Sequence, residues 1–300
     1  MSAAIRESAG TEGVVSFVKK HGRPYPAIDP LQADLSGKTV VITGASKGCG
    51  REAAIAFAQS GASNIVITAR SDLSDVVADI KKAALEAGRE AEPNVLNGSG
   101  VDATSAKDVE GLAKKVAETF GAVDLLINNA AFLSEWAPVA ETDPDEWWTN
   151  WEVNIKGTYL FTRYFIPLVL KSSSLKTVLN ITSIGAVNIG AGASGYQTTK
   201  FAVCRLTEHI AADYADQGLI CVAAHPGSYL TEMGKRLPAY LHDKLTDDVA
   251  LSGQWMAWFA RERREWLQAR FVAATWDVTE LEARKDEIVK GNKLKFRMVV

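Results

Sequence analysis

Tyr196 and Lys200 are four residues apart, so on a helix their side chains share one face. A phenol has a pKa of about 10, and a lysine ammonium one helical turn away stabilises the phenolate and lowers that pKa. Such a pair could pass a proton to or from a bound molecule near neutral pH. The spacing alone is weak evidence, because Tyr240 and Lys244 repeat it.

The residues that precede each pair distinguish them. Ser183 lies thirteen residues before Tyr196, directly after a strand-like run at 177–182, whereas the corresponding position before Tyr240 is Gly227, which has no hydroxyl. Residues 177–199 carry no charge, but they are too rich in glycine and polar side chains to lie in a bilayer. Because sites form at the carboxyl ends of strands in open parallel sheets, the sequence favours a site at Ser183, Tyr196 and Lys200.

Three glycines, Gly44, Gly48 and Gly50, follow a predicted strand at 39–43 and introduce a predicted helix at 50–59. Glycines at such a turn let the backbone approach a pyrophosphate, which the free N–H groups and the dipole of the helix N-terminus stabilise. The same residues could form a plain tight turn. Their position between the first strand and the first helix favours a dinucleotide-binding turn.

The choice of dinucleotide depends on the residue about 20 positions further on, where an acidic residue holds the ribose of NAD and an arginine accommodates the 2′-phosphate of NADP. That position holds Arg70, and Ala69 stands where an aspartate would select NAD. Lys47 adds a second cation, whereas Asp72 is an unfavourable neighbour for a phosphate. The pattern predicts NADP(H) rather than NAD(H). The alternative is that Lys47 and Arg70 are ordinary surface charges.

These motifs together resemble the short-chain dehydrogenase/reductase family over about residues 37–275. The features that carry the resemblance are T-G-x-x-x-G-x-G at 43–50, Asp102, N-N-A-A at 128–131 (the family has N-N-A-G), Asn154, N-I-T-S at 180–183, and Pro226-Gly227 with Thr231. The N-terminal arm with Tyr25-Pro26 and the residues at 270–278 resemble a fungal branch of that family.

The resemblance implies a catalytic tetrad of Asn154, Ser183, Tyr196 and Lys200. A carbonyl that accepts hydride develops negative charge on its oxygen, so hydrogen-bond and proton donors must lie beside it. Tyr196 is expected to give the proton and Ser183 to polarise the carbonyl. Lys200 is expected to lower the pKa of Tyr196 and to hold the nicotinamide ribose, while Asn154 holds a water that supplies protons to Lys200.

The expected cofactor contacts are Gly44, Ser46, Lys47, Gly48, Gly50, Arg70, Ser71, Asp102, Asn129, Ala130, Tyr196, Lys200, Pro226, Gly227 and Thr231. Three positions depart from the family pattern: Ala131 replaces a glycine, Cys49 a branched aliphatic residue, and Tyr229 a valine or isoleucine. Residues 228–251 are expected to form a lid over the substrate, with Tyr229 and Met233 in the substrate pocket. The mostly apolar lid favours a hydrophobic carbonyl compound.

Short β-branched runs alternate with longer helical patterns, as in a parallel sheet with helices on both faces. We therefore expect a single doubly wound, Rossmann-like α/β domain over residues 37–300, ending in a C-terminal helix and tail at 277–300. Residues 1–36 are expected to be an N-terminal extension on its surface, because they show weak periodicity and contain three prolines. The predicted strands are 39–43, 65–68, 95–101, 123–128, 177–182 and 219–224, and further predicted helices are 72–86 and 105–120.

Composition argues against several classes of protein. The net charge is −3, so a nucleic-acid-binding surface is not expected. Three cysteines without C-x-x-C spacing and four well-separated histidines argue against a disulfide framework and a metal site. The first thirty residues lack the apolar core of a signal peptide, and no membrane partner is expected, so we predict a cytoplasmic protein.

Two local clusters, one of tryptophans and one of charged residues, bear on packing and assembly. Trp147, Trp148 and Trp151 cluster near Asn154, and core packing with a subunit interface is favoured over an aromatic substrate cage. The resemblance implies a homodimer or homotetramer, through helices around 150–170 and 196–214. Basic and acidic residues alternate at 261–265, which is typical of a solvated helix face.

The sequence therefore predicts an NADP-dependent carbonyl reductase, or an alcohol dehydrogenase in the reverse direction, that acts on a hydrophobic small molecule such as a secondary metabolite. Two alternatives stay open. One is a dehydratase, isomerase or cyclase of the same fold in which NADP(H) is partly structural, although the intact tetrad counts against it. The other is a non-catalytic dinucleotide-binding protein.

Overall fold

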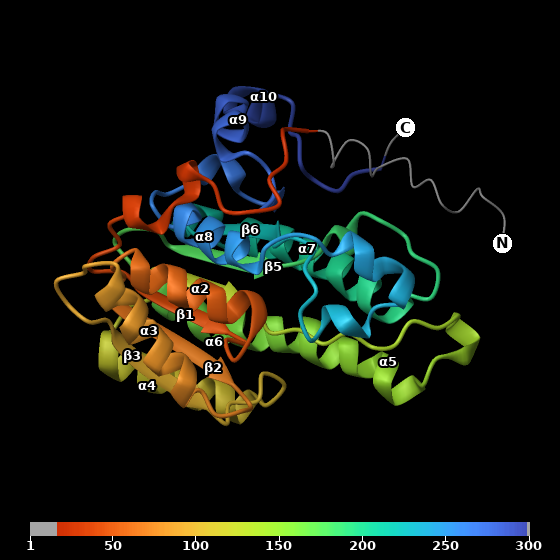
Figure 1. The fold of residues 1–300 in the computed structure, drawn as a ribbon, viewed down its shortest axis with the longest axis horizontal. Helices are drawn as coiled ribbons and strands as arrows, with labels where there is room; N and C mark the ends of the chain where they lie inside the picture. The colour runs from red at the N-terminus through yellow and green to blue at the C-terminus, as the bar shows by residue number, and fades with distance from the viewer. Residues whose placement is uncertain (1–16, 299–300) are drawn as a thin grey trace.

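A seven-stranded sheet with the order β3-β2-β1-β4-β5-β6-β7 forms the framework of the computed structural model, which describes residues 17–298 (Figure 1). Every neighbouring pair of strands is parallel. The strands are β1 Thr39–Thr43, β2 Asn64–Ala69, β3 Asn94–Ser99, β4 Leu125–Asn128, β5 Thr177–Ile181, β6 Ile220–His225 and β7 Phe271–Ala273. The predicted doubly wound α/β sheet is confirmed.

Two hydrophobic layers cover the sheet, because successive residues of a strand point to opposite faces. Val40 and Ile42 of β1 pack in the layer with α2, α3 and α8, whereas Val41 packs with α4, α6 and α7. The helices are α2 Gly48–Gln59, α3 Ser74–Glu86, α4 Ala106–Phe120, α5 Pro144–Trp151, α6 Thr158–Val169, α7 Ser194–Tyr214, α8 Val249–Phe259, α9 Val278–Ala283 and α10 Lys285–Lys290.

The carboxyl ends of all seven strands meet at one edge of the sheet, since the strands are parallel. The strand order reverses between β1 and β4, which lie side by side although β2 and β3 come between them in the chain. Ligands of doubly wound sheets bind outside such a switch point. The fold therefore places the loops after β1, β4, β5 and β6 around one site.

The described part of the N-terminal segment, residues 17–36, is not a surface extension. Ile28 and Leu35 are fully buried in the same layer as α2 and α8, and Lys20 pairs with Trp276 in an antiparallel bridge. The red N-terminal segment lies beside the blue C-terminal helices in Figure 1. The predicted surface position is therefore wrong for these residues, because its sparse apolar side chains pack on elements far away in the sequence. The rest of the predicted extension, residues 1–16, lies outside the described residues.

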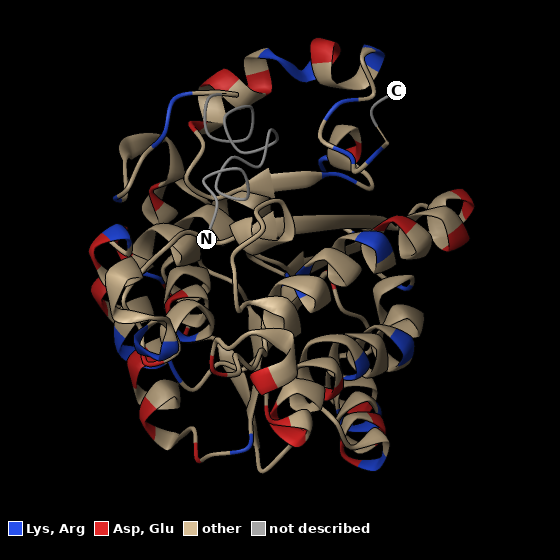
Figure 2. Cartoon of the chain, turned by 90° about the vertical axis from the view of Figure 1, so that its right-hand side faces the viewer, with Lys and Arg blue, Asp and Glu red and all other residues tan. Residues whose placement is uncertain are grey.

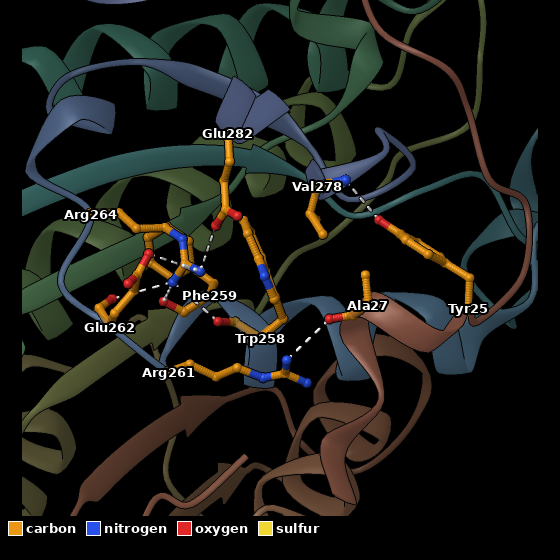
Figure 3. Close-up of polar contacts among 9 residues, drawn as sticks. All are labelled: Tyr25, Ala27, Trp258, Phe259, Arg261, Glu262, Arg264, Val278 and Glu282. Carbon is orange, nitrogen blue, oxygen red and sulfur yellow. Dashed lines mark hydrogen bonds and ion pairs between the residues drawn. The ribbon is translucent and has the colours of Figure 1, made fainter. Parts of the chain in front are cut away.

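The basic residues at 261–264 are not a solvated helix face, because α8 ends at Phe259 and they belong to the turn that follows it. Arg264 is only 3% exposed, its guanidinium carbon lies 3.8 Å from the ring centroid of Trp258, and it forms an ion pair with Glu282 at 3.1 Å. Arg261 donates to the carbonyl oxygen of Ala27 in the N-terminal segment (Figure 3). These arginines connect α8 with chain segments at both ends.

The C-terminal region differs from the prediction in two details. Residues 277–298 form two short helices, α9 and α10, rather than one, and β7 adds a strand that its three residues are too few to reveal by pattern. The expected lid at 228–251 contains two 3₁₀ turns, Gly234–Arg236 and Ala239–Lys244, and ends earlier because α8 already begins at Val249.

Charged residues of both signs are interspersed over the helices that face the viewer in Figure 2. This distribution agrees with the small net charge of the whole chain. Within residues 17–298, no helix combines the length and the apolar character needed to cross a membrane.

Candidate active site

A cleft of about 1850 Å³ opens at the carboxyl edge of the sheet. It is lined by the loops after β1 to β6, by the start of α7 and by the lid. The predicted site residues that line it are Gly44, Ser46, Lys47, Gly48, Arg70, Ser71, Asp102, Asn129, Ala130, Ser183, Tyr196, Lys200, Pro226, Tyr229, Thr231 and Met233. Three predicted residues, Gly50, Asn154 and Gly227, do not line it.

The turn after β1 needs its glycines for two different reasons. Gly44 and Gly48 have φ values of +65° and +57°, which side-chain-bearing residues rarely adopt, and α2 begins at Gly48. A Cβ atom at Gly50 would lie 2.5 Å from the carbonyl oxygen of Gly44 and 2.6 Å from Nδ2 of Asn129. Gly50 therefore lets α2 pack against the loops after β1 and β4, and the bare backbone at Gly44 and Gly48 fits a pyrophosphate at the helix N-terminus.

The far end of the cleft is cationic. Lys47 and Arg70 are exposed and line the cleft, and Ala69 at the end of β2 offers no carboxylate. The neighbouring carboxylate of Asp72 accepts hydrogen bonds from the N–H and the hydroxyl of Ser74, and Asp72 does not line the cleft. Asp72 is therefore engaged with Ser74 at the start of α3 and is not part of the cleft lining.

Asp102 lies on the same side of the cleft, in the loop after β3. Its Oδ1 accepts hydrogen bonds from the N–H of Thr104 at 2.8 Å and from the Thr104 hydroxyl at 2.9 Å. Burial alone would raise the pKa of Asp102, but these hydrogen bonds and the charge of Arg70 lower it on balance. The carboxylate is therefore ionised and held in one orientation near neutral pH.

Tyr196 and Lys200 share one face of α7, and Ser183 at the end of β5 lies in the same part of the cleft. The Nζ of Lys200 lies 5.6 Å from the ring centroid of Tyr196 and donates to the carbonyl oxygen of Ile181 at 3.0 Å. The Oγ of Ser183 accepts the N–H of Gly185 at 3.0 Å, which leaves its own proton available to another group. The structure thus brings three of the four expected catalytic side chains together.

Burial dominates the acid–base properties of this group. It raises the pKa of Tyr196 to about 12, against the opposing effect of the hydrogen bond with Ser183, and it lowers the pKa of Lys200 to about 8. The net shift of the Tyr196 pKa is therefore upward in this structure, and its lowering by Lys200 stays a prediction.

The buried ammonium of Lys200 predicts a pH-dependent stability. The pKa of Lys200 is about 8 in the folded protein and 10.5 for a solvated lysine side chain, so between these values the unfolded chain binds more protons and the free energy of unfolding rises with pH. Relative to a Lys200→Met variant, the wild type should gain about 3 kcal/mol between pH 7.5 and 10.5. Denaturant titrations of both proteins measure this difference, and titrations shared by both proteins cancel. Parallel pH profiles would contradict it.

Asn154 lies behind the cleft rather than in it. It is 1% exposed, within a π-helical turn at Glu152–Gly157 between α5 and α6. Its Oδ1 accepts the N–H of Phe132 at 2.8 Å, and its Nδ2 donates to the carbonyl oxygen of Phe132 at 3.0 Å and to the hydroxyl of Thr199 at 2.9 Å. Asn154 therefore ties the loop after β4 to α7 beside Lys200, and both ends of its amide are occupied by protein groups.

Tyr229 lines the cleft but is only 9% exposed, and its place in the substrate pocket stays a prediction. The hydroxyl of Tyr229 accepts a hydrogen bond from Sγ of Cys49 in the glycine turn, at 3.0 Å. The ring also lies close to Gly227, where a Cβ atom would be 2.8 Å from Cε1 of Tyr229. Gly227 is thus required by the packing of Tyr229, which fixes the start of the lid against the glycine turn.

Sequence reasoning missed several residues of the cleft, among them Trp136 after β4, Asn188 after β5, and His225 at the end of β6. Burial lowers the pKa of His225 to about 3, so its imidazole is neutral at physiological pH. These positions follow strand ends, which is the one signal that could have found them.

Comparison with known proteins agrees with this geometry. The family model for short chain dehydrogenases matches residues 38–241. The chain is 44% identical over 288 residues to the short chain dehydrogenase mpl6 of Monascus purpureus, which covers 96% of this chain and 98% of the relative. It is 40% identical over 298 residues to the short chain dehydrogenase pigC of Monascus ruber, at 98% and 97% coverage.

Solved structures show the same fold. A 3-oxoacyl-[acyl-carrier protein] reductase from Brucella melitensis in complex with NAD superposes with a TM-score of 0.70 at 21% identity, covering 79% of this chain and 95% of the other. A short chain dehydrogenase from Salmonella enterica gives a TM-score of 0.69 at 25% identity, covering 84% and 99%. The chain belongs to the short chain dehydrogenase family, a family of oxidoreductases, and to the fungal branch that its motifs resemble.

Proposed function

We propose that the protein is an NADP(H)-dependent carbonyl reductase, or an alcohol dehydrogenase in the reverse direction, with a hydrophobic small-molecule substrate. The observation that carries the proposal is the convergence of Ser183, Tyr196 and Lys200 on one part of a cleft whose other end holds the glycine turn, Lys47 and Arg70. The catalytic group and the dinucleotide turn therefore share one cavity, as hydride transfer requires.

Each side chain has a defined task in the reduction. The hydroxyl of Ser183 donates to the carbonyl oxygen and orients it, and the phenol of Tyr196 gives its proton to that oxygen as negative charge develops there. Bound nicotinamide dinucleotide supplies the hydride. The ammonium of Lys200 stabilises the phenolate that remains, and Asn154 positions α7 through its hydrogen bond to Thr199.

A reduction screen tests this function. Purified protein is titrated with NADPH and with NADH by fluorescence, and then assayed with a panel of hydrophobic ketones and aldehydes. Turnover of at least one carbonyl compound supports the proposal. Tight dinucleotide binding without turnover would favour the non-catalytic binding protein, and elimination or isomerisation without net oxidation of the cofactor would favour the lyase or isomerase alternative.

The preference for NADP(H) rests on charge. Arg70 and Lys47 line the cleft, where they can face a 2′-phosphate, while the nearby carboxylate of Asp72 is engaged with Ser74 and does not line it. NADPH should therefore bind about tenfold more tightly than NADH, a difference of about 1.4 kcal/mol.

Replacing Arg70 by aspartate should reverse this preference, because it removes a cation from the expected phosphate position and places a carboxylate where it can accept from ribose hydroxyls. The expected change is about tenfold or more in the ratio of the two dissociation constants, measured by fluorescence titration. Lys107→Asp, an exposed change of the same charge outside the cleft, controls for net charge. An unchanged ratio in Arg70→Asp would remove Arg70 from the cofactor site.

Exposed apolar side chains on the lid bear on the class of substrate, and those on α6 and α7 bear on the oligomeric state. Leu230 and Tyr240 are 48% and 68% exposed and line the cleft, which suits a hydrophobic substrate.

Outside the cleft, α6 and α7 expose Tyr159 and Phe201, at 47% and 44%. We infer a homodimer or homotetramer through these helices, which light scattering of the purified protein tests.

A further inference from the structure

The lid is closed at its base, where its two ends meet. Tyr229 and Thr246 pair in an antiparallel bridge. Beside them, the N–H of Ser228 donates to Oδ2 of Asp247 at 2.7 Å, and the N–H of Asp247 donates to the carbonyl oxygen of Ser228 at 3.0 Å. Residues 230–245 therefore form a loop whose two ends are held together, and we call them the lid body.

The lid body has little internal support. Of its residues, all of which the structure describes, Gly234 alone is buried. Its backbone hydrogen bonds stay within the lid, as when the N–H of Arg236 donates to Met233 at 3.1 Å and that of Leu241 donates to Pro238 at 2.8 Å. Helical turns this short do not persist on their own in water. The order of the lid body therefore depends on what holds it to the rest of the molecule.

One side chain connects the lid body to α5 and to the loop after β4. The guanidinium of Arg236 forms an ion pair with Glu146 of α5, and its central carbon lies 5.0 Å from the ring centroid of Phe132. Phe132 lines the cleft. Within residues 17–298, no other side chain of the lid body forms a hydrogen bond, an ion pair or a ring contact with a residue outside the lid.

Both partners of this arginine belong to segments that are fixed to α7. The backbone of Phe132 is held by Asn154, which also donates to the hydroxyl of Thr199 in α7 at 2.9 Å. On α5, the indole N–H of Trp147 donates to Oγ of Ser194 at the start of α7, at 3.1 Å. Because α7 carries two members of the proposed catalytic group, the arginine sets the lid body in a defined position relative to that group.

We propose that Arg236 is the positioning residue of the lid: its contacts with Glu146 and Phe132 hold the lid body closed over the cleft, and the lid body is released when they break. The side chains of Arg236 and Glu146 are 42% and 32% exposed. An ion pair and a cation–π contact in such a setting are each weak, and together they favour the closed lid by about tenfold. The lid can therefore open for substrate entry and product release.

Hydrogen exchange of the whole protein tests the proposal, because the short turns of the lid body lose protection when it is released. In Arg236→Gln, the amides of residues 230–245 should exchange about tenfold faster than in the wild type. Amides of β1 and α8 should keep their rates, since the sheet and its helices are untouched. Glu146→Gln leaves the contact with Phe132, so its expected increase is about threefold. It should add nothing in the Arg236→Gln background, where its partner is already gone.

Lys235→Gln is the matched control. Lys235 is exposed and directly precedes Arg236, but it forms its ion pair, at 2.5 Å, with Glu232 inside the lid body. In this variant the exchange of residues 230–245 should stay within about twofold of the wild type. An unchanged rate in Arg236→Gln, an equal increase in Lys235→Gln, or additive increases in the double variant with Glu146→Gln would overturn the proposal.

A kinetic readout rests on the proposed function as well. For a carbonyl compound that the wild type reduces, Arg236→Gln should raise KM by about three- to tenfold. The value of kcat should stay within about twofold, because Ser183, Tyr196 and Lys200 are unchanged. An unchanged KM would contradict a lid that holds the substrate. If no carbonyl compound is reduced, the proposed function fails, and the exchange rates still decide whether Arg236 holds the lid.

Discussion

A Tyr196→Phe variant should lose about 100- to 10,000-fold in kcat, the range by which a positioned general acid accelerates proton transfer. The phenol is the group on α7 whose proton can reach a carbonyl held by Ser183, and phenylalanine fills the same space without a proton. Dinucleotide affinity should stay within about threefold, because the glycine turn and the cations at the far end of the cleft are untouched. Steady-state assays with a substrate found in the reduction screen, together with fluorescence titration, measure both quantities.

The control for this prediction is Tyr159→Phe, which removes an exposed hydroxyl from α6 outside the cleft. That variant should keep wild-type turnover. Full activity in Tyr196→Phe would show that another group supplies the proton, and a parallel loss of dinucleotide binding would show that Tyr196 holds the cofactor instead. The expected loss of turnover with cofactor binding intact identifies Tyr196 as the proton donor.

Replacing Arg264 by alanine should lower the free energy of unfolding by about 3–5 kcal/mol, because it deletes a large buried side chain that packs on Trp258 and donates to a backbone carbonyl. The guanidinium is shielded from solvent. It donates hydrogen bonds to the carbonyl oxygens of Trp258 at 3.1 Å and Phe259 at 2.8 Å, where α8 ends. Alanine removes the arginine's hydrogen bond to the Phe259 carbonyl, opens a cavity beside the Trp258 ring and removes the partner of Glu282 (Figure 3). Urea denaturation of the two proteins measures the loss.

Glu262→Gln provides the comparison, because Glu262 is the solvent-exposed partner of the same arginine, at 63% exposed and 3.5 Å. That change should cost no more than about 1 kcal/mol, as for an exposed ion pair. An equally small loss in Arg264→Ala would mean that the turn after α8 rearranges and that the arginine does not hold it.

The sequence predicts the sheet well because parallel strands are buried on both faces. Such strands are recognisable in a sequence as continuous β-branched runs. Each of the six predicted strands is present, and none of its ends is shifted by more than two residues. β7 escapes prediction because three residues contain no period, and because it pairs only with β6. The position of residues 17–36 also escapes prediction, since their few apolar residues bury against elements late in the chain.

The site is predictable where the chemistry needs a residue type at a fixed spacing from a strand end, as at Ser183, Tyr196 and Lys200. It is less predictable where a side chain is recruited by packing. Tyr229 packs against Cys49 of the glycine turn and against Gly227. No pattern in the sequence predicts that contact. The alternating basic and acidic residues at 261–265 predict that Arg264 is a surface charge. That pattern does not reveal that the ring of Trp258 covers the guanidinium.

The N-terminal segment has a consequence for the order in which the protein can fold. His21 pairs with Asp277 and Tyr25 with Val278, across 256 and 253 positions of the chain. During synthesis residues 21–28 emerge long before their partners in α8 and α9, so Ile28 stays uncovered until those helices have been made. Closing so long a loop is slow and comes late. The residues after β7 therefore fasten this segment, and a chain cut before Trp276 should leave His21 and Tyr25 without these partners.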